Sequence, residues 1–484
     1  MASRLVIKLF PEILVKSRNL RRSLTKNLAS NIRNLSRDLD VKVAVKELWD
    51  QLDVRMTNDS TDDVESMVER LSNMPGIDKI ERIQRYPFSG PESIVSEVIE
   101  HNVDKISGKS FRVNVKRKGT HDFKSFELEQ FLGGNLLQSV PSSRVDLHNP
   151  DVTVDVHINQ DQADMVSEVI QGIGGFPMGT QGQVLSLLSG GFDSGVSSYM
   201  SMKRGFKTHF CFFNLGGVNH EIGVKQLADF LWRKYSFSHR VKFINVPFEP
   251  VVAEILKSVD HTHMGVILKR LMIQAANQIS ESLKAKALVT GESLAQVSSQ
   301  TLPNLNLIDS VSEQLIIRPL IVSDKQEIIA TAKRIGTESF ALSMPEYCAV
   351  ISDRPTSNAK LSKIRAEEEK FDYAVLEEAI KAATIEPIDR ILEAVDTPFE
   401  TQEIKTPAKS DVILDIRHSE NEKPLPFTHN QVIRVPFYKV DKTLEAADES
   451  QRFLLYCERG VMSHMQAAQL QSKGFQNVMV LKAS

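Results

Sequence analysis

Cysteine is scarce in this chain. Only three of its 484 residues are cysteine, Cys211, Cys348 and Cys457, which is too few for the disulfide framework of a small secreted protein. No run of about 18 apolar residues is present, so no transmembrane helix is expected. The first residues also lack the apolar core and small-residue cleavage site of a signal peptide. We therefore expect a cytoplasmic protein with no membrane partner, in which any cysteine that matters is chemically active.

What the chain does contain is typical of soluble globular proteins. Hydrophobic residues make up 41% and charged residues 25%, and the length suits about three to four domains. The net charge of −3 hides an uneven distribution. Residues 1–40 carry nine Lys/Arg against three Asp/Glu, and residues 105–124 carry seven against one. A polyanion would be drawn to these segments, although a single charged run is often only a solvated surface.

Residues 183–194 hold the most informative stretch. An apolar run, typical of a buried strand, ends at Ser189-Gly-Gly-Phe-Asp-Ser194 and is followed by a helical pattern. Gly190 and Gly191 allow backbone turns that a Cβ would forbid and leave room for a ligand, while the helix N-terminus directs N–H groups at the turn. Asp193 could hold Mg²⁺. The pattern predicts a phosphate site and lacks the Gly-Lys-Ser/Thr ending of a Walker A loop; the alternative is a tight turn without a ligand.

The string Ser-Gly-Gly-Phe-Asp-Ser resembles the loop of the PP-loop ATP pyrophosphatase family. The resemblance implies that ATP is cleaved between its α and β phosphates and that a carbonyl oxygen is adenylated. From Gly182 onward, strand patterns alternate with helix patterns, which predicts a parallel sheet covered on both faces, as in Rossmann-like folds. Ligands of such sheets lie at the carboxyl ends of the strands, which is where this loop stands.

The N-terminal half shows a different plan. Strand and helix patterns between residues 4 and 86 follow the order βαββαβ, which is the ferredoxin-like arrangement. The stretch Phe111-Arg-Val-Asn-Val-Lys-Arg-Lys118 and the strand 149–155 resemble the THUMP domain, an RNA-binding module. Basic residues beside aromatic ones suit contacts to an RNA backbone. The predicted RNA-binding residues are Arg112, Lys116, Arg117 and Lys118.

The last segment predicts a small α/β domain with a cysteine at a strand-to-helix turn. Cys457 directly follows an apolar strand, and a helix N-terminus would stabilise its thiolate, the form that accepts and passes on sulfur. Residues 405–484 resemble a rhodanese homology domain through Leu414-Asp-Ile-Arg417 and the Cys-x-x-Gly-x-x-Ser loop. The resemblance implies a persulfide on Cys457; the alternative is an inert buried cysteine. Cys348 has polar or turn-forming neighbours and could be either structural or exposed and reactive, whereas Cys211, among phenylalanines, is expected to be structural.

Several positions of the central segment match ATP-binding positions of the PP-loop family. The loop 290–301 offers polar donors next to the expected nucleotide face, and the alternative for it is a capped turn. Lys269 could neutralise phosphate, although a solvated helical lysine is the alternative, and Arg318, Asp324 and Lys325 are further candidates. Ala295 stands where similar sequences often have glycine, and we expect this small replacement to be harmless. The expected ATP-binding residues are Leu187, Leu188, Ser189, Gly190, Gly191, Ser194, Lys269, Gly291 and Gln300.

The domain order resembles that of the long-form tRNA 4-thiouridine synthetases. The expected boundaries are a ferredoxin-like domain at 1–60, THUMP at 61–168, the PP-loop domain at 178–384, a linker at 385–404 and a rhodanese domain at 405–484. The resemblance implies ATP-dependent sulfur transfer to uridine 8 of tRNA through an adenylated uridine. The catalytic residues would be Asp193, the persulfide carrier Cys457 and the resolving Cys348.

The resemblance also implies partners and leaves rivals. A cysteine desulfurase would load the persulfide, and a sulfur-carrier protein of thiamine thiazole synthesis would be a second acceptor. No spacing typical of a resident metal site is present. The rival functions are a PP-loop enzyme that adenylates another RNA base or a small molecule, and a non-enzymatic RNA-binding protein with degenerate sites.

Overall fold

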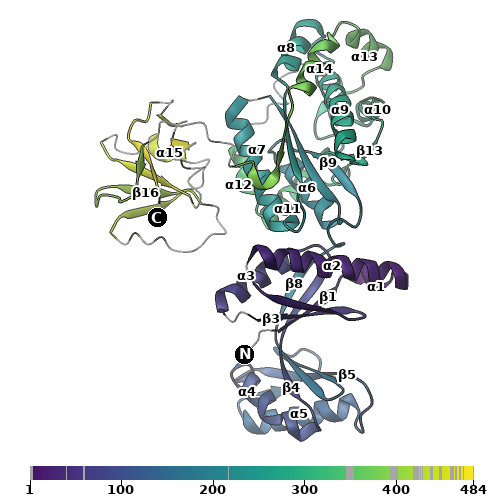
Figure 1. Cartoon of the computed structure of the whole chain (residues 1–484), viewed down its shortest axis with the longest axis vertical. Coiled ribbons are helices and arrows are strands. Elements are labelled where there is room, and N and C mark those ends of the chain that lie inside the picture. The colour runs from purple at the N-terminus through teal and green to yellow at the C-terminus, as the bar shows by residue number, and fades with distance from the viewer. Residues whose placement is uncertain are drawn as a thin grey trace. The chain divides into compact units, whose positions relative to one another are not determined.

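The computed structural model of the chain divides into two compact units, residues 1–180 with 203–205, and residues 181–202 with 206–484 (Figure 1). None of the helices in the described part of the chain is long and apolar enough to cross a membrane. The structure describes residues 4–39, 41–57, 60–215, 217–344, 354–392, 402–417, 425, 427, 429–435, 440–445, 450–457, 463, 466–467, 470–471 and 474–482.

The first unit begins with the predicted βαββαβ order, so the ferredoxin-like fold is confirmed. Its helix α2 forms because apolar residues recur at helical spacing, and it buries Leu24, Leu28 and Ile32 against the sheet. Strand β1 pairs antiparallel with both β3 and β4. The elements are β1 (Arg4–Leu9), α1 (Pro11–Leu14), α2 (Arg18–Asp38), β2 (Val43–Glu47), β3 (Gln51–Met56), α3 (Thr61–Ser72) and β4 (Ile77–Pro87).

The remainder of this unit carries the expected THUMP-like strands and helices. One eight-stranded sheet runs through both parts in the order β2-β3-β1-β4-β8-β7-β5-β6. Helices α4 and α5 supply Val98, Leu128 and Leu132 to the core on its second half. The elements are α4 (Val95–Ile106), β5 (Ser110–Lys118), α5 (Ser125–Ser139), β6 (Arg144–Val145), β7 (Val152–Asn159) and β8 (Gln162–Gly174).

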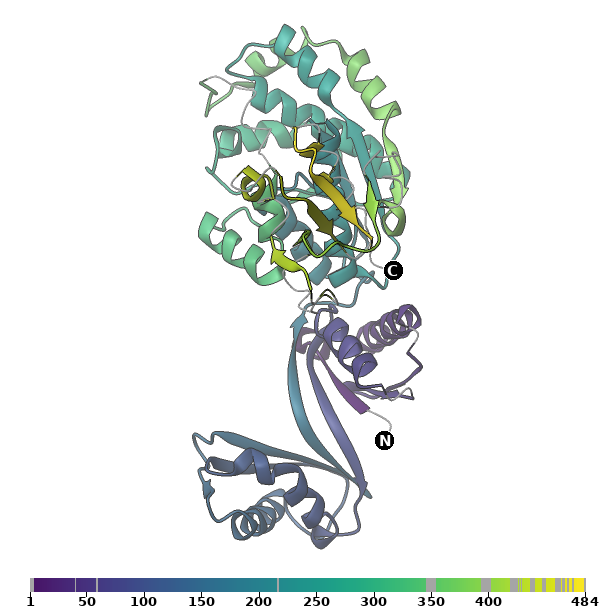
Figure 2. The ribbon, with the colours of Figure 1, turned by 90° about the vertical axis from the view of Figure 1, so that its left-hand side faces the viewer.

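Strands β4 and β8 join the two parts of the sheet, and Figure 2 shows them as the two longest strands of the unit. The sequence did not predict β8. Two register shifts interrupt the β4–β8 pairing. A β-bulge changes which face the following side chains point to, so β8 lacks the regular alternation that identifies a strand.

The second unit contains the predicted Rossmann-like sheet, in the order β13-β12-β9-β10-β11-β14. All pairs among β9 to β13 are parallel, which confirms the prediction for this domain. The strands are β9 (Gln183–Leu187), β10 (Lys207–Asn214), β11 (Lys242–Pro247), β12 (Ala287–Val289) and β13 (Leu315–Ile317). The main helices are α6 (Phe192–Lys203), α7 (Gly217–Leu231), α8 (Glu249–Ser258), α9 (Met264–Leu283) and α11 (Lys325–Ile335).

The segment expected to be a linker starts with a strand, and this part of the prediction is corrected. β14 (Thr384–Pro387) pairs antiparallel with β11, so the sheet is mixed at that edge. Lys225 Nζ of α7 lies 2.9 Å from Glu386 Oε1, and Ile388 and Ile391 are fully buried. Pro387 and the acidic residues around it gave the segment the composition of a linker, while the ion pair and the two isoleucines attach it to the domain.

The C-terminal part is a separate five-stranded parallel sheet in the order β15-β19-β18-β16-β17. The small α/β domain predicted for this segment is present, and the apolar runs at 411–416, 453–456 and 477–481 form β16, β18 and β19. These strands bury side chains on both faces of the sheet, namely Ile413, Leu454 and Leu481 on one face and Leu414 and Leu455 on the other. The elements are β15 (Glu403–Ile404), β16 (Val412–Asp415), β17 (Gln431–Arg434), α15 (Val440–Glu445), β18 (Phe453–Tyr456) and β19 (Val478–Leu481).

Candidate active site

The loop Ser189–Ser194 connects β9 to α6 at the carboxyl end of the parallel sheet, as predicted. Ser194 Oγ organises it: this hydroxyl accepts hydrogen bonds from Ser189 N (3.1 Å) and Ser189 Oγ (3.2 Å) and donates to Gly191 O (3.2 Å). Gly190 has a φ of +90°, a conformation that favours glycine. Leu187 ends β9, and Leu188 N donates to Cys211 O at 2.8 Å. The loop backbone is therefore fixed by its own chain.

Gly291 brings the end of β12 against the same loop. A Cβ on Gly291 would lie 2.6 Å from the Asp193 carbonyl carbon and 2.7 Å from Ser194 N, closer than real Cβ atoms approach. Glycine is thus required by the packing of the end of β12 on the first turn of α6. The structure confirms that the predicted positions Ser189–Ser194 and Gly291 lie together.

Two side chains from later segments of the chain contact the Asp193 carboxylate. Its Oδ1 lies 2.8 Å from Lys325 Nζ, and its Oδ2 accepts a hydrogen bond of 2.8 Å from Gln296 Nε2. Lys325 was one of the further candidates from the sequence, and its ammonium also lies over the Phe192 ring, 5.6 Å from the centroid. The carboxylate is oriented at the N-terminus of α6, where a negative charge is stabilised.

Lys269 belongs to a buried charge network rather than to a solvated helix face. Its Nζ lies 2.8 Å from Glu292 Oε1, and Arg318 Nε donates to Glu292 Oε2 at 2.7 Å. Burial raises the pKa of Glu292, but the charges and hydrogen bonds of Lys269 and Arg318 outweigh it and lower this pKa to about 2. Arg318 is also paired with Asp309. The sequence did not identify Glu292 or Asp309, whose roles depend on contacts between distant segments.

The loop 290–301 supplies two amides to the site. Gln300 is buried, and its Oε1 and the Oε1 of Gln296 have no hydrogen-bond partner among the described residues. Buried polar atoms are normally paired, so these two oxygens are suited to a polar ligand. Within the loop, Gln300 N donates a hydrogen bond to Val297 O, and Gln300 O accepts one from Ala295 N. These bonds fix the backbone that carries both amides.

We expected alanine to be a harmless replacement for glycine at position 295, but the backbone conformation there disfavours alanine. It has a φ of +62° and is exposed, so it occupies the left-handed region that alanine disfavours by roughly 1–2 kcal/mol. The sequence argument considered the size of the side chain, whereas the backbone conformation is what distinguishes alanine from glycine here.

The residues present are compatible with Mg²⁺ only together with phosphate oxygens. Among the described residues no group of three or more His, Cys, Asp or Glu side chains is placed to hold a metal ion. Asp193 is the one carboxylate within the loop Ser189–Ser194 itself. Mg²⁺ is commonly bound by one or two carboxylates and substrate phosphates, and that donor set fits this site.

Cys457 follows β18 and is buried, with 6% of its surface exposed. Its sulfur accepts hydrogen bonds from Ser463 Oγ (3.0 Å) and Ser463 N (3.4 Å). Arg459 and the rest of 458–462 lie outside the described residues.

The other two cysteines differ from Cys457. Cys211 is fully buried on β10, and burial raises the pKa of its thiol, which agrees with a structural role. Cys348 lies outside the described residues, so its predicted role stays a prediction.

The predicted RNA-binding residues lie on β5. Lys116, Arg117 and Lys118 are exposed at the end of this strand. Arg117 donates to the carbonyl oxygens of His121 (3.1 Å) and Phe123, so it braces the following loop. Arg112 reaches Leu147 O at 3.5 Å. The two lysines are therefore the members of the set whose charges are directed to solvent.

A second basic surface, which we call the α2 stripe, consists of Arg18, Arg22 and Lys26. These residues are exposed and spaced four apart. Among the described residues none of the three has a carboxylate within ion-pair distance. Beside them, the Arg21 guanidinium lies 3.4 Å from the ring centroid of Trp49, which is 56% exposed.

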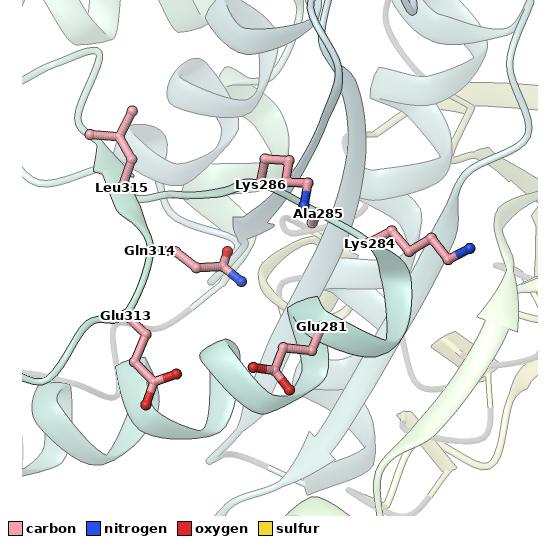
Figure 3. Close-up of a pocket in the computed structure, with 7 residues that line it drawn as sticks. All are labelled: Glu281, Lys284, Ala285, Lys286, Glu313, Gln314 and Leu315. Atoms are coloured by element: carbon pink, nitrogen blue, oxygen red, sulfur yellow. The ribbon is translucent and has the colours of Figure 1, made fainter.

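The second unit has a surface pocket, whose lining residues are drawn in Figure 3. It is lined by Glu281, by residues 284–286 just before β12, and by residues 313–315, which lead into β13 and include its first residue. The pocket therefore lies at the amino ends of these parallel strands. The loop Ser189–Ser194 follows β9 at the opposite edge.

Family models match three ranges of the chain: the ThiI ferredoxin-like domain at residues 5–80, the THUMP domain at 92–168, and the thiamine biosynthesis protein (ThiI) at 179–373. The first match extends to residue 80, whereas the boundary expected from the sequence was at 60.

Curated relatives match along the whole chain. A tRNA sulfurtransferase of Shewanella sp. (strain MR-4) is 48% identical over 480 residues, and one of Tolumonas auensis (strain DSM 9187 / NBRC 110442 / TA 4) is 48% identical over 482; both matches cover 99% of each chain.

Two solved structures share the fold. A 4-thiouridine synthetase in complex with RNA and bound ATP matches with a TM-score of 0.70 at 24% identity, over 80% of this chain and 100% of that chain. PH1313 from Pyrococcus horikoshii Ot3 matches with a TM-score of 0.55 at 19% identity, over 69% and 99%.

Proposed function

The chain belongs to the tRNA sulfurtransferase family, and we propose that it transfers sulfur to uridine 8 of tRNA in an ATP-dependent reaction that gives 4-thiouridine. The observation that carries the proposal is the loop Ser189–Ser194, in which Asp193 is oriented by Lys325 and Gln296 at the carboxyl end of the sheet. The solved 4-thiouridine synthetase that shares the fold was found with RNA and ATP, which supports both substrates.

The first step activates the base. The uridine 4-oxygen attacks the α phosphorus of ATP, the bond to the bridging oxygen of the β phosphate breaks, and pyrophosphate leaves. The loop N–H groups at the α6 N-terminus and Lys269 stabilise the charge that develops on pyrophosphate. Mg²⁺, when bound beside Asp193, would neutralise phosphate charge at the same place. Gln296 and Gln300 offer amide oxygens for the polar edge of the nucleotide.

The second step transfers sulfur. A cysteine desulfurase supplies the persulfide on Cys457, whose terminal sulfur attacks C4 of the base as AMP leaves. The thiolate of Cys348 then attacks the Cys457 sulfur, the S–S bond breaks, and 4-thiouridine is released with a disulfide between the two cysteines. A dithiol reductant returns two electrons to reopen the disulfide. Ser463 would position the Cys457 sulfur for these steps through its two hydrogen bonds.

The basic surfaces of the first unit would hold the tRNA. Lys116 and Lys118 are exposed at the end of β5, and the α2 stripe exposes three more cations. Contacts of this kind position an RNA through its phosphates and carry little sequence information. The choice of uridine 8 would then follow from the shape of the tRNA.

The test is the nucleoside content of tRNA from a strain that lacks its own 4-thiouridine enzyme. We expect 4-thiouridine, measured by mass spectrometry, with the wild-type chain and none with Asp193→Ala or Cys457→Ser. Cys211→Ala is the matched cysteine control and should retain the product. A different modified base would favour the rival PP-loop enzyme that adenylates another RNA base, and unmodified tRNA with the wild-type chain would contradict the proposal.

We further propose that Cys457 supplies sulfur for the thiamine thiazole through a sulfur-carrier protein. The family model that matches residues 179–373 is described as a thiamine biosynthesis protein, and Cys457 lies on its own five-stranded sheet. Sulfur transfer from a persulfide requires no adenylation of uridine. Asp193→Ala should therefore support growth without thiamine, whereas Cys457→Ser should not; thiamine dependence of both variants would contradict the separation.

A further inference from the structure

Met344 lies between two glycines that come from different elements. It directly follows α12 (Glu338–Ser343) and is 9% exposed. A Cβ on Gly223 of α7 would lie 2.8 Å from the Met344 sulfur, and a Cβ on Gly190 would lie closer still. Real Cβ atoms do not approach this closely, so a Cβ at either position would require the flexible Met344 side chain to move out of the space it occupies.

This packing changes the meaning of Gly190. The sequence suggested that its missing side chain leaves room for a ligand, but the space on its Cβ side is filled by Met344 and bordered by Val224 Cγ2 at 3.2 Å. At Gly190 the loop therefore packs against Met344 and α7. The same helix also contacts Ser189, whose carbonyl oxygen lies 3.0 Å from His220 Nε2.

Support of this kind affects how well a glycine loop binds phosphate. A Gly-Gly backbone has many accessible conformations, and ordering it on binding costs free energy. Only a conformation with its N–H groups directed at one point can bind an anion. A loop that is already ordered before the ligand binds has a higher affinity, because no free energy is lost in ordering it on binding.

We propose that Met344 is a positioning residue for the nucleotide: its thioether holds Gly190 in the left-handed conformation and so keeps the loop Ser189–Ser194 ordered for the phosphates of ATP. The inference rests on the proposed function only in taking ATP as the ligand. An unbranched, flexible side chain suits the gap between two glycines better than a branched one. Met344 does not contact the reacting atoms and acts through Gly190.

Titration with the non-hydrolysable α,β-methylene analogue of ATP tests the proposal on the full chain. Met344→Ala removes the support, and Gly223→Ala places a Cβ where the sulfur packs, so each should weaken binding about tenfold. Met344→Leu restores most of the volume and should stay within about threefold of wild type. Gly134→Ala on α5 is the matched control, because a Cβ there meets nothing within 4 Å, and it should bind like wild type.

Two results would overturn the proposal. One is unchanged affinity, within twofold, in Met344→Ala. The other is a loss confined to the number of binding-competent molecules, with the same dissociation constant, which would indicate a purely structural role. Steady-state kinetics give a second readout: KM for ATP should rise with kcat nearly constant. Because the titration requires no tRNA, a wild-type chain that binds the analogue but forms no 4-thiouridine would contradict the proposed function and leave this inference intact.

Discussion

Glu292 is the residue on which the charge balance of the candidate site depends. It is buried between Lys269 and Arg318, within 2.8 Å of both. Lys269 and Arg318 contact the same carboxylate, and two cations this close to one another would repel strongly in a low-dielectric site without it. The carboxylate therefore allows Lys269 to remain beside the expected phosphate position with its side chain oriented.

Replacement of Glu292 by Gln should destabilise the fold by about 3 kcal/mol, because it leaves two buried cations without their shared anion. The pKa of Glu292 is lowered from 4.5 to about 2. Its stabilising contribution is therefore complete above pH 4.5 and is lost as the pH falls from 4.5 toward 2. Urea denaturation at pH 7 and pH 3 checks both points. Glu281→Gln, at an exposed position of α9, should change little; a similar small change for Glu292→Gln would contradict the prediction.

Ala295 gives a prediction of the opposite sign. Replacement by Gly should stabilise the fold by about 0.5–1 kcal/mol, since relief of the left-handed conformation exceeds the added flexibility of the unfolded chain. The matched control is Ala253→Gly at an exposed interior position of α8, which should destabilise by about 1 kcal/mol. Thermal unfolding of the two variants measures both. Equal destabilisation in the two would show that the backbone at Ala295 is not strained.

At the scale of elements, His209 connects three neighbouring strands of the central sheet. It lies on β10, its Nδ1 accepts a hydrogen bond from Lys242 N of β11 (3.0 Å), and its Nε2 contacts Gln183 Oε1 of β9 (3.1 Å). An Nδ1 that accepts is unprotonated, so this arrangement requires the neutral ring. Burial, and then the charges of Lys207 and Lys242, lower the pKa of His209 to about 4.

The free energy of unfolding should consequently decrease as the pH falls from 6.5 toward 4, by up to roughly 3 kcal/mol, because the unfolded chain binds the proton first. His209→Gln should remove this part of the pH dependence. The chain has two tryptophans, Trp49 and Trp232, so a Trp49→Phe background lets Trp232 fluorescence report urea denaturation of the second unit alone. Identical pH profiles with and without His209 would contradict the prediction.

The sequence predicted the helices and strands that the pattern of their own residues is sufficient to specify. Strands β9 to β13 are apolar runs followed by turns or helices, so local pattern was sufficient. β8 was missed because bulges break its alternation, and β14 because its attachment depends on Lys225, 161 positions earlier in the chain. The site divides in the same way. Asp193, Lys269, Gly291 and Gln300 are predicted as site residues from motifs, whereas the proposed roles of Glu292 and Met344 depend on contacts that no local pattern records.

At the scale of the whole molecule, the uneven charge distribution has a cost that a partner could offset. Arg18, Arg22 and Lys26 stand at i, i+4 spacing, where like charges repel, and Arg18 and Arg22 lie at the N-terminus of α2, where the helix dipole disfavours cations. No acidic residue occupies the first turn of this helix. Arg33, further along α2, is by contrast paired with Glu47 at 3.6 Å. An arrangement that reduces helix stability is consistent with selection for binding a polyanion.

This contrast within one helix gives the last prediction. Arg18→Ala with Arg22→Ala should weaken tRNA binding about tenfold near 0.15 M salt and make log Kd less dependent on log salt by between one and two units, since two phosphate contacts are lost. The same pair should slightly stabilise α2, because repulsion is removed. Filter binding over a series of salt concentrations measures the first effect and thermal unfolding the second. Arg33→Ala is the matched control, because its charge is already neutralised by Glu47, and it should leave the salt dependence unchanged. If the double variant bound tRNA like wild type at every salt concentration, the uncompensated charge of α2 would require another explanation, and the phosphate contacts would be confined to the end of β5.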